Sequence, residues 1–140
     1  MMDAAIQISS DRSLLDVNKI HGVIKSSYWG SYRSVEQTKK TIENSLCFGA
    51  YCAEEQIGFA RVLTDEVVLA HIMDVVIFEG YKGKGIGKRL MEYILKDSRV
   101  RDVLSITLKT KDAHTFYEKY GFKKVGNSKL WMAIDRAKLE

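Results

Sequence analysis

The chain has 140 residues, of which 46% are hydrophobic and 29% are charged, the size and composition of one globular domain over residues 1–140. It lacks a run of the ~18 apolar residues that a membrane helix needs, and residues 1–6 do not resemble a secretion signal. We therefore expect a cytoplasmic protein that does not bind membranes. The net charge of +4 does not by itself indicate a nucleic-acid-binding protein, because a polyanionic small molecule would match it equally well.

The first part of the chain predicts a strand, a helix and a loop. Ala4–Ser9 is typical of a short strand. Ser13 followed by Asp16 resembles a capping box, and apolar residues then recur at helical spacing to about Ser26. Residues 27–33, which we name the aromatic loop, contain two tyrosines and a tryptophan.

A second helix and a set of strands follow the aromatic loop. Ser34 with Gln37 forms a capping box that predicts a helix to about Ser45. Apolar, β-forming segments then predict three antiparallel strands with a turn at residues 54–56. These strands are Cys47–Ala53, Ile57–Leu63 and Val67–Phe78.

The last part of the chain predicts a further helix after residues 85–87, a strand, a short helix and a hairpin. Val103–Lys109 is typical of a strand, and Ala113–Lys119 of a short helix that Gly121 ends. Phe122–Val125 and Lys129–Ile134 predict a hairpin. The order β-αα-βββ-α-β-α-ββ predicts an α+β fold, with a mixed, mostly antiparallel central sheet flanked by helices.

The two cysteines, Cys47 and Cys52, are not expected to form a disulfide. On one strand they would lie about 16 Å apart on opposite faces, whereas a disulfide needs Cα atoms within roughly 7 Å. Together with three histidines at no metal-binding spacing, they predict no structural metal.

A glycine-rich turn over Lys82–Lys88 lies between an apolar strand and an amphipathic helix. The start of a helix leaves four N–H groups without intrahelical partners and carries a partial positive charge. Glycines let a phosphate approach these groups without a Cβ in the way. The turn therefore predicts a phosphate site; the alternative is an ordinary glycine-rich connection with solvated lysines.

The spacing of this turn excludes two other phosphate motifs. The P-loop needs four residues between its glycines, whereas three separate Gly83 from Gly87, and Arg89 stands where Ser or Thr is required. The dinucleotide fingerprint GxGxxG fails because the third glycine comes one position early and is followed by Lys88.

Two blocks resemble the GNAT superfamily of acyl-CoA-dependent N-acyltransferases. Residues 82–87, KGKGIG, are similar to the family's [Q/R]-x-x-G-x-[G/A], with Lys82 in place of Gln or Arg. Residues 113–122, AHTFYEKYGF, are similar to A-x-x-[FL]-Y-E-K-x-G-F. Thr110 stands where the family often has an asparagine that contacts the cofactor, and its hydroxyl can still donate a hydrogen bond.

The resemblance implies a GNAT-like fold, acetyl-CoA as cofactor and coenzyme A as product. It implies that the main chain of Val75, Val76 and Ile77 pairs with the pantetheine arm, in a gap where this strand and Val103–Lys109 splay apart. The other cofactor-binding residues that it implies are Thr110 and the turn, namely Lys82, Gly83, Lys84, Gly85, Ile86, Gly87 and Lys88.

Acyl transfer to an amine needs a neutral amine, a donor for the oxyanion and a proton for the leaving thiolate. The resemblance places Tyr117 near the thioester sulfur, and a tyrosine is protonated at neutral pH. Asp74 is the favoured base, with His71, Glu79 or an ordered water as alternatives. Tyr28, Trp29 and Tyr32 are candidates for the wall of an acceptor site, or for a cover over the core.

The sequence therefore predicts an N-acetyltransferase that passes an acetyl group directly to a primary amine in a ternary complex. A small-molecule acceptor is favoured over a protein, and a monomer or homodimer is expected. A non-catalytic acyl-CoA-binding module is the main alternative. Nucleic-acid binding is not expected, because basic and aromatic residues are not interleaved.

Overall fold

The computed structural model describes residues 6–136. Residue contacts divide the chain into two compact units, one ending at Leu108 and one beginning at Lys109. The expected single domain over residues 1–140 stays a prediction. Within residues 6–136, no helix combines the length and the apolar character that a membrane crossing requires.

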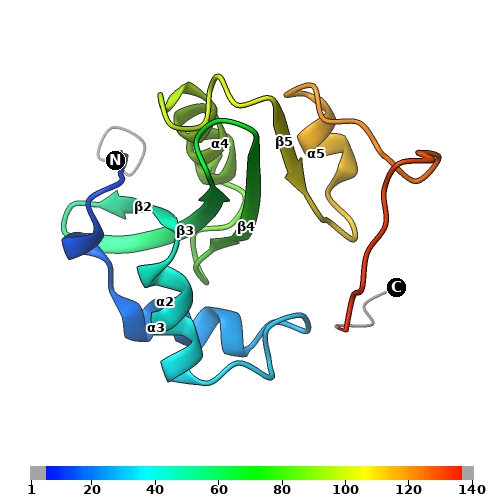
Figure 1. The fold of residues 1–140 in the computed structure, drawn as a ribbon. Helices are drawn as coiled ribbons and strands as arrows, with labels where there is room; N and C mark the ends of the chain where they lie inside the picture. Colours follow the sequence, from blue (N-terminus) through cyan, green and yellow to red (C-terminus); the bar gives the residue numbers. More distant parts are fainter. Residues whose placement is uncertain (1–5, 137–140) are drawn as a thin grey trace. The chain divides into compact units, whose positions relative to one another are not determined.

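The first unit is a twisted sheet with helices on both faces (Figure 1). The strand order is β1-β2-β3-β4-β5. Within residues 6–136, β4 and β5 are the one parallel pair, so the expected mixed, mostly antiparallel sheet is confirmed. In chain order the elements are β1 (Ile6–Ser9), the 3-10 helix η1 (Arg12–Leu14), α2 (Val17–Lys25), α3 (Val35–Glu43), β2 (Leu46–Cys52), β3 (Glu55–Thr64), β4 (Leu69–Ile77), α4 (Ile86–Lys96), β5 (Ser105–Leu108) and, in the second unit, α5 (His114–Glu118).

Neighbouring residues of β3 face different helices, as the pleat of a strand requires. Gly58 lies against Ile86 of α4, since a Cβ on Gly58 would be 3.3 Å from the Ile86 Cγ2 atom. Phe59 belongs to the core that Ile20 and Ile24 of α2 and Ile42 of α3 form on the other face. The sheet is thus covered by α4 on one face and by α2 and α3 on the other.

The first long helix begins later than predicted. Ser13 lies in η1, where the Asp11 carboxylate accepts a hydrogen bond from the Ser13 N–H (3.0 Å). The Asp16 carboxylate accepts from the Lys19 N–H (3.1 Å) and caps α2. Two successive aspartate caps therefore replace the expected capping box at Ser13, because each starts its own helical turn.

The predicted capping box of α3 is confirmed. The Ser34 hydroxyl accepts from the Gln37 N–H (3.1 Å), and the Gln37 side chain accepts from the Ser34 N–H (2.8 Å). The first strand begins at Ile6 in the described part, and Ala4 and Ala5 lie outside it. Cys47 and Cys52 are both free.

The predicted C-terminal hairpin is wrong. Phe122–Val125 and Lys129–Ile134 carry no strand in the part of the chain that the structure describes, although residues 126–127 do form a turn. The Leu130 and Met132 side chains are 88% and 93% exposed, so the apolar pattern that suggested a strand buries little. A two-stranded hairpin without such burial is marginally stable at best.

Tyr51 of β2 carries a buried hydroxyl group for which the described residues offer no hydrogen-bond partner. Its ring covers Gly49, since a Cβ on that glycine would lie 2.6 Å from the Tyr51 Cζ atom. Burial, and then the nearby Asp11 and Cys47, raise the pKa of Tyr51 to about 12. The folded state therefore favours the neutral phenol.

We expect Tyr51→Phe to raise the free energy of unfolding by about 1 kcal/mol at pH 7, because it removes an unsatisfied buried hydroxyl. In the wild type, the Tyr51 pKa is about 12 when folded and ~10 when unfolded. Its contribution to stability is therefore complete below pH ~10 and is lost as the pH rises towards 12. Urea denaturation should show that the difference in the free energy of unfolding between Tyr51→Phe and the wild type is larger at pH 11 than at pH 7. Tyr93→Phe, at a side chain that is 40% exposed, is the control; equal pH profiles for Tyr51→Phe and wild type would contradict the prediction.

Candidate functional site

The glycine turn opens α4 with free main-chain donors. Gly83 and Gly85 have φ values of 78° and 77°, which favour glycine, and a Cβ on either would meet nothing within 4 Å. Gly85 is the N-cap, and the first N–H to bond back to it is that of Arg89 (3.2 Å). The N–H groups of residues 86–88 precede that bond and have no intrahelical carbonyl partner. They lie at the positive end of the helix dipole, where main-chain N–H groups are suited to bind an anion.

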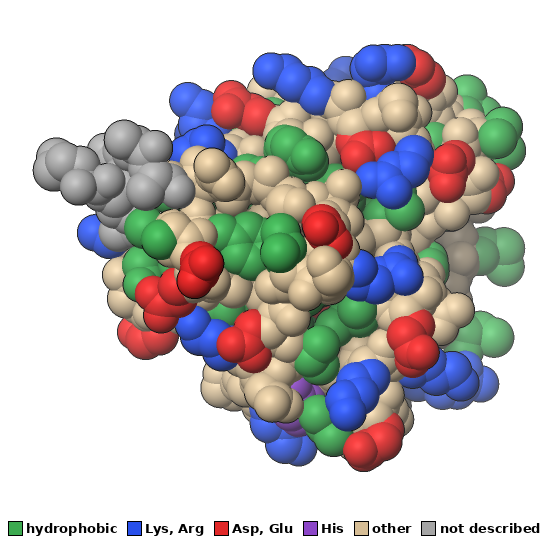
Figure 2. Space-filling model, turned by 90° about the vertical axis from the view of Figure 1, so that its left-hand side faces the viewer, with side chains coloured by type: hydrophobic (Ala, Val, Ile, Leu, Met, Phe, Trp, Pro, Cys, Tyr) green, Lys and Arg blue, Asp and Glu red, His purple; other side chains and the backbone are tan. Residues whose placement is uncertain are grey.

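The side chains around this turn lie mostly in solvent. Lys84, Lys88 and Arg89 are exposed. Lys82 is 4.0 Å from Glu79, with side chains 71% and 96% exposed, and such a surface pair adds little stability. On the face that Figure 2 shows, basic and acidic side chains are interspersed.

The Ile86 side chain is buried in the core, so only its main chain is available to a ligand. Its packing against Gly58 fixes the start of α4 on the sheet.

Among the described residues, the edge of β4 on the side of β5 is paired over only part of its length. The parallel register joins Leu69–Ile72 to Ser105–Leu108 and ends there, while β4 continues to Ile77. On the other side, β3 still pairs with β4 as far as Ile77. The main chain of residues 75–77 thus lies beyond the end of β5 pairing, where it suits an extended ligand arm.

A β-bulge interrupts β4 at the same point. Arg61 of β3 pairs with Met73 and Phe59 pairs with Val76, so Asp74 and Val75 together oppose a single residue. Asp74 has a φ of 52°, in the left-handed region that residues other than glycine rarely adopt. The bulge changes the direction of β4 next to the unpaired edge.

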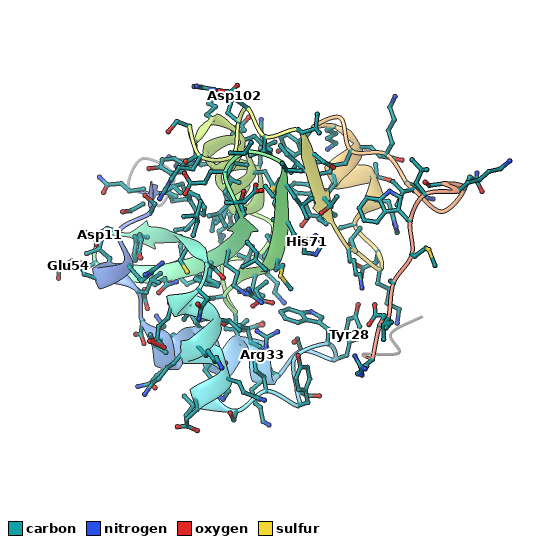
Figure 3. The ribbon with its side chains drawn as sticks, viewed as in Figure 1. Asp11, Tyr28, Arg33, Glu54, His71 and Asp102 are labelled. Atoms are coloured by element: carbon teal, nitrogen blue, oxygen red, sulfur yellow. The ribbon has the colours of Figure 1, made fainter. Side chains whose placement is uncertain are left out.

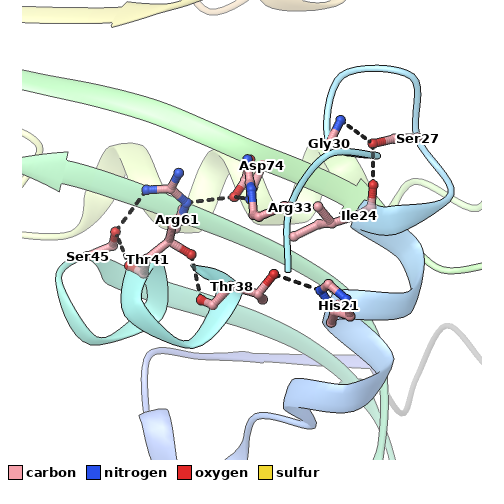
Figure 4. A network of polar contacts seen from close by, with 10 residues as sticks. All are labelled: His21, Ile24, Ser27, Gly30, Arg33, Thr38, Thr41, Ser45, Arg61 and Asp74. Atoms are coloured by element: carbon pink, nitrogen blue, oxygen red, sulfur yellow. Dashed lines mark hydrogen bonds and ion pairs between the residues drawn. The ribbon is translucent and has the colours of Figure 1, made fainter. Parts of the chain in front are cut away.

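The Asp74 carboxylate is held by two arginines (Figure 4). Arg33 donates through Nη1 to Oδ2 (2.7 Å) and through Nη2 to Oδ1 (3.4 Å), and Arg61 donates through Nε to Oδ2 (2.7 Å). The Asp74 side chain is 4% exposed and each arginine side chain is 7% exposed. Both oxygens are engaged with permanent cations, which argues against Asp74 as the base that takes a proton from an amine.

Arg33 was not singled out by the sequence, because its partner lies 41 residues away along the chain. Burial works to lower the pKa of Arg33, but the hydrogen bonds and charges of Asp74 and then Tyr32 together outweigh this effect and raise that pKa. Arg33 is therefore a fixed cation in this site.

The aromatic loop meets this ion cluster through Arg33. The Arg33 guanidinium carbon lies 5.8 Å from the Trp29 ring centre and 5.9 Å from the Tyr32 ring centre. Trp29 packs on the core, whereas Tyr28 and Tyr32 are 58% and 71% exposed. Figure 3 shows Tyr28 and Arg33 on the connection between α2 and α3 and His71 on β4. The predicted acceptor residues thus include one core side chain and two exposed ones.

His71 is engaged with the neighbouring strand. Its Nδ1 atom lies 2.6 Å from the Thr107 hydroxyl of β5. His71 and Thr107 are opposite each other in the parallel register, so the contact supports the pairing of β4 with β5.

Tyr117 and Thr110 lie in the second unit. Tyr117 of α5 is half-buried between Phe116 and Phe122, with ring centres 5.0 Å and 6.0 Å away. Burial raises the pKa of Tyr117, so its phenol is neutral at physiological pH. The Thr110 hydroxyl accepts from the Ala113 N–H (3.0 Å) before α5. Across residues 6–136, His, Cys, Asp and Glu side chains do not gather in groups of three or more suited to a metal ion.

Comparisons with known proteins identify the family. A family model described as an acetyltransferase (GNAT) domain matches residues 43–124. The chain is similar to a crystal structure from Xanthomonas campestris pv. campestris of a protein assigned to the GNAT family, with a TM-score of 0.85 and 30% identity, covering 92% of this chain and 93% of that one.

Curated relatives are similar over parts of their length. An uncharacterized ycf52-like N-acetyltransferase of Prochlorococcus marinus is 35% identical over 99 residues, covering 67% of this chain and 54% of that protein. Histone acetyltransferase TAP1 of Glycine max is 31% identical over 108 residues, covering 76% and 41%. The chain spans about half the length of the curated relatives it matches first. Because the family model matches more than half of the chain, the chain belongs to the GNAT family of acetyltransferases.

Proposed function

We propose that the protein transfers the acetyl group of acetyl-CoA to a primary amine. The proposal rests on two sets of main-chain groups that follow each other along the chain. One is the unpaired edge of β4 at residues 75–77, and the other is the helix start at residues 85–88. An extended arm followed by a diphosphate needs a strand-like partner and then an anion site. Acetyl-CoA, when bound, supplies the acyl group as a thioester.

The residues proposed to hold the cofactor act mainly through their main chain. Val75, Val76 and Ile77 offer the edge of β4, and residues 83–88 offer the glycine turn. Each hydrogen bond to a charged group contributes ~1.5–3 kcal/mol. The exposed lysines of the turn add attraction that salt screens, and the Thr110 hydroxyl remains a proposed donor.

An amine acceptor must lose a proton before it can attack. A lysine-like amine with a pKa of ~10.4 is only about 0.1% neutral at pH 7.4. Because the oxygens of Asp74 are occupied by two arginines, we propose that an ordered water, rather than this carboxylate, takes the proton. A main-chain N–H of residues 75–77 is the proposed donor to the oxyanion.

We propose Tyr117 as the acid that protonates the leaving thiolate. The raised pKa of its half-buried phenol keeps the proton available over the neutral range. Direct transfer is favoured over an intermediate on Cys47, because burial raises the pKa of the Cys47 thiol. A buried neutral thiol is a poor nucleophile.

The acceptor is proposed to be a small molecule whose amine-bearing part lies against Tyr28, Trp29 and Tyr32. Two of these rings lie beside the Arg33 cation, and the exposed tyrosines offer apolar area with hydroxyl groups at its rim. A protein amine is the competing acceptor, because a relative from Glycine max carries the name histone acetyltransferase.

A backbone test addresses the phosphate site. Gly85→Ala places a methyl group beside the helix start and strains a residue with a φ of 77°, so we expect acetyl-CoA to bind at least about tenfold more weakly. Gly80→Ala is the matched control, since Gly80 also has a positive φ (90°) with nothing within 4 Å of its Cβ position. Isothermal titration with acetyl-CoA compares the two folded variants. Equal affinity for both would contradict the proposed site.

The acid is tested with Tyr117→Phe. We expect single-turnover acetyl transfer to slow by about 10²-fold, with acetyl-CoA affinity unchanged, because the variant keeps the ring but lacks the proton. Thiol release is followed over a panel of spermidine, tyramine, kanamycin and a peptide with a free N-terminus.

Tyr120→Phe is the control, since Tyr120 shares the same aromatic cluster with a ring centre 5.6 Å from that of Phe116. A Tyr117→Phe protein that transfers the acetyl group at the wild-type single-turnover rate would remove this tyrosine from the mechanism. Tight acetyl-CoA binding without release of thiol to any amine would favour the non-catalytic module.

A further inference from the structure

We propose that Arg33 and Asp74 are positioning residues. The buried cluster of Arg33, Asp74 and Arg61 fixes the aromatic loop against the β4 bulge. This attachment sets the position of the residues that face the acceptor. The assignment of the loop to the acceptor rests on the proposed function. The attachment itself rests on contacts within the first unit.

The cluster joins three segments that are distant in the sequence. Arg33 is the last residue of the aromatic loop and precedes α3, Arg61 lies on β3, and Asp74 lies at the bulge of β4. Arg33 reaches Asp74 across 41 residues and Arg61 reaches it across 13. The carboxylate is therefore the common attachment point of the loop and of the central sheet.

The second positive charge of the cluster has its own partners. Arg61 donates through Nη1 to the Ser45 hydroxyl (3.1 Å), which donates to the Thr41 carbonyl (2.6 Å) in the last turn of α3. The carbonyl end of a helix carries a partial negative charge. This end of α3 thus helps to balance the two guanidinium groups that share one carboxylate (Figure 4).

The aromatic loop is attached at both of its ends. At the α2 end, the Ser27 hydroxyl donates to the Ile24 carbonyl (2.6 Å) and accepts from the Gly30 N–H (3.1 Å). Gly30 is packed so closely that a Cβ on it would lie 2.6 Å from the Ile24 Cγ2 atom. At the other end, Arg33 donates its N–H to the Gly30 carbonyl (3.1 Å) and its guanidinium to Asp74.

The two arginines of the cluster therefore have different roles. Arg33 connects Asp74 to the aromatic loop and lies beside the Trp29 and Tyr32 rings. Arg61 connects Asp74 to β3 and to α3 but contacts no ring of the loop among the contacts described. Loss of Arg33 should release the loop, whereas loss of Arg61 should leave the loop bound to Asp74.

The test uses Trp29 as a reporter of the loop. The chain has two tryptophans, so Trp131→Phe leaves Trp29 as the only one. In this background, Arg33→Met and Arg61→Met each remove one guanidinium. We expect Arg33→Met to raise the acrylamide quenching constant of Trp29 roughly twofold, because the loop opens locally. Arg61→Met should leave quenching near the background value.

Arg99→Met is a further control, since Arg99 pairs with Asp97 at 2.9 Å away from the cluster. It should change neither quenching nor transfer. An equal rise of the quenching constant in Arg33→Met and Arg61→Met would overturn the proposal, because it would indicate that the whole protein is loosened. An unchanged quenching constant in folded Arg33→Met would also overturn it. If Arg33→Met does not fold, Arg33→Lys and Arg61→Lys give the same comparison, because lysine cannot make the two-point contact.

Transfer kinetics then test the acceptor side. With the panel amine that the wild type acetylates fastest, we expect Arg33→Met to raise the KM for the amine about tenfold and to leave the acetyl-CoA dissociation constant unchanged. A parallel rise in both constants would overturn the acceptor assignment. If the protein acetylates no panel amine, the proposed function is refuted. The quenching measurement needs no turnover, so it still tests whether Arg33 attaches the loop.

Discussion

In β4, a single carboxylate binds two guanidinium groups at a residue with an unusual backbone conformation. Asp74 has a φ of 52°, and a residue in such a region costs on the order of 1–3 kcal/mol unless its surroundings enforce it. Three hydrogen bonds from Arg33 and Arg61 fix its side chain, so the backbone follows. The bulge therefore depends on tertiary contacts more than on the local sequence.

Much of the site's geometry follows from this bulge. The pairing of β4 with β5 ends at Ile72, and Asp74 interrupts the strand two residues later. Beyond the bulge, β4 keeps β3 as its neighbour, and its other edge pairs with no strand among the described residues. Since the same carboxylate holds Arg33, the segment proposed to face the cofactor and the loop proposed to face the acceptor share one buried attachment point.

The parts of the site that the sequence could predict are those encoded within a few residues. The capping box of Ser34 and Gln37 and the glycine turn are local, and glycine adopts the left-handed φ of Gly83 and Gly85 with no side-chain contact to enforce it. The role of Asp74 could not be read in the same way, because it depends on an arginine 41 residues away. The hairpin over residues 122–134 failed for a related reason: an alternating pattern predicts a strand only where a core exists to bury one face.

The replacement of the family's usual Gln or Arg by Lys82 fits a site in which the main chain does most of the binding. The Lys82 side chain is 71% exposed and its ion-pair partner, Glu79, is 96% exposed, so both side chains are surrounded mainly by water. Exposed cations mainly accelerate the approach of an anion and lose their effect in salt. The N–H groups at the start of α4 are fixed in direction by the helix and by the buried Ile86 side chain. In the proposed site, their hydrogen bonds to a phosphate are short-range and do not depend on which cation stands at position 82, so the proposal is compatible with lysine there.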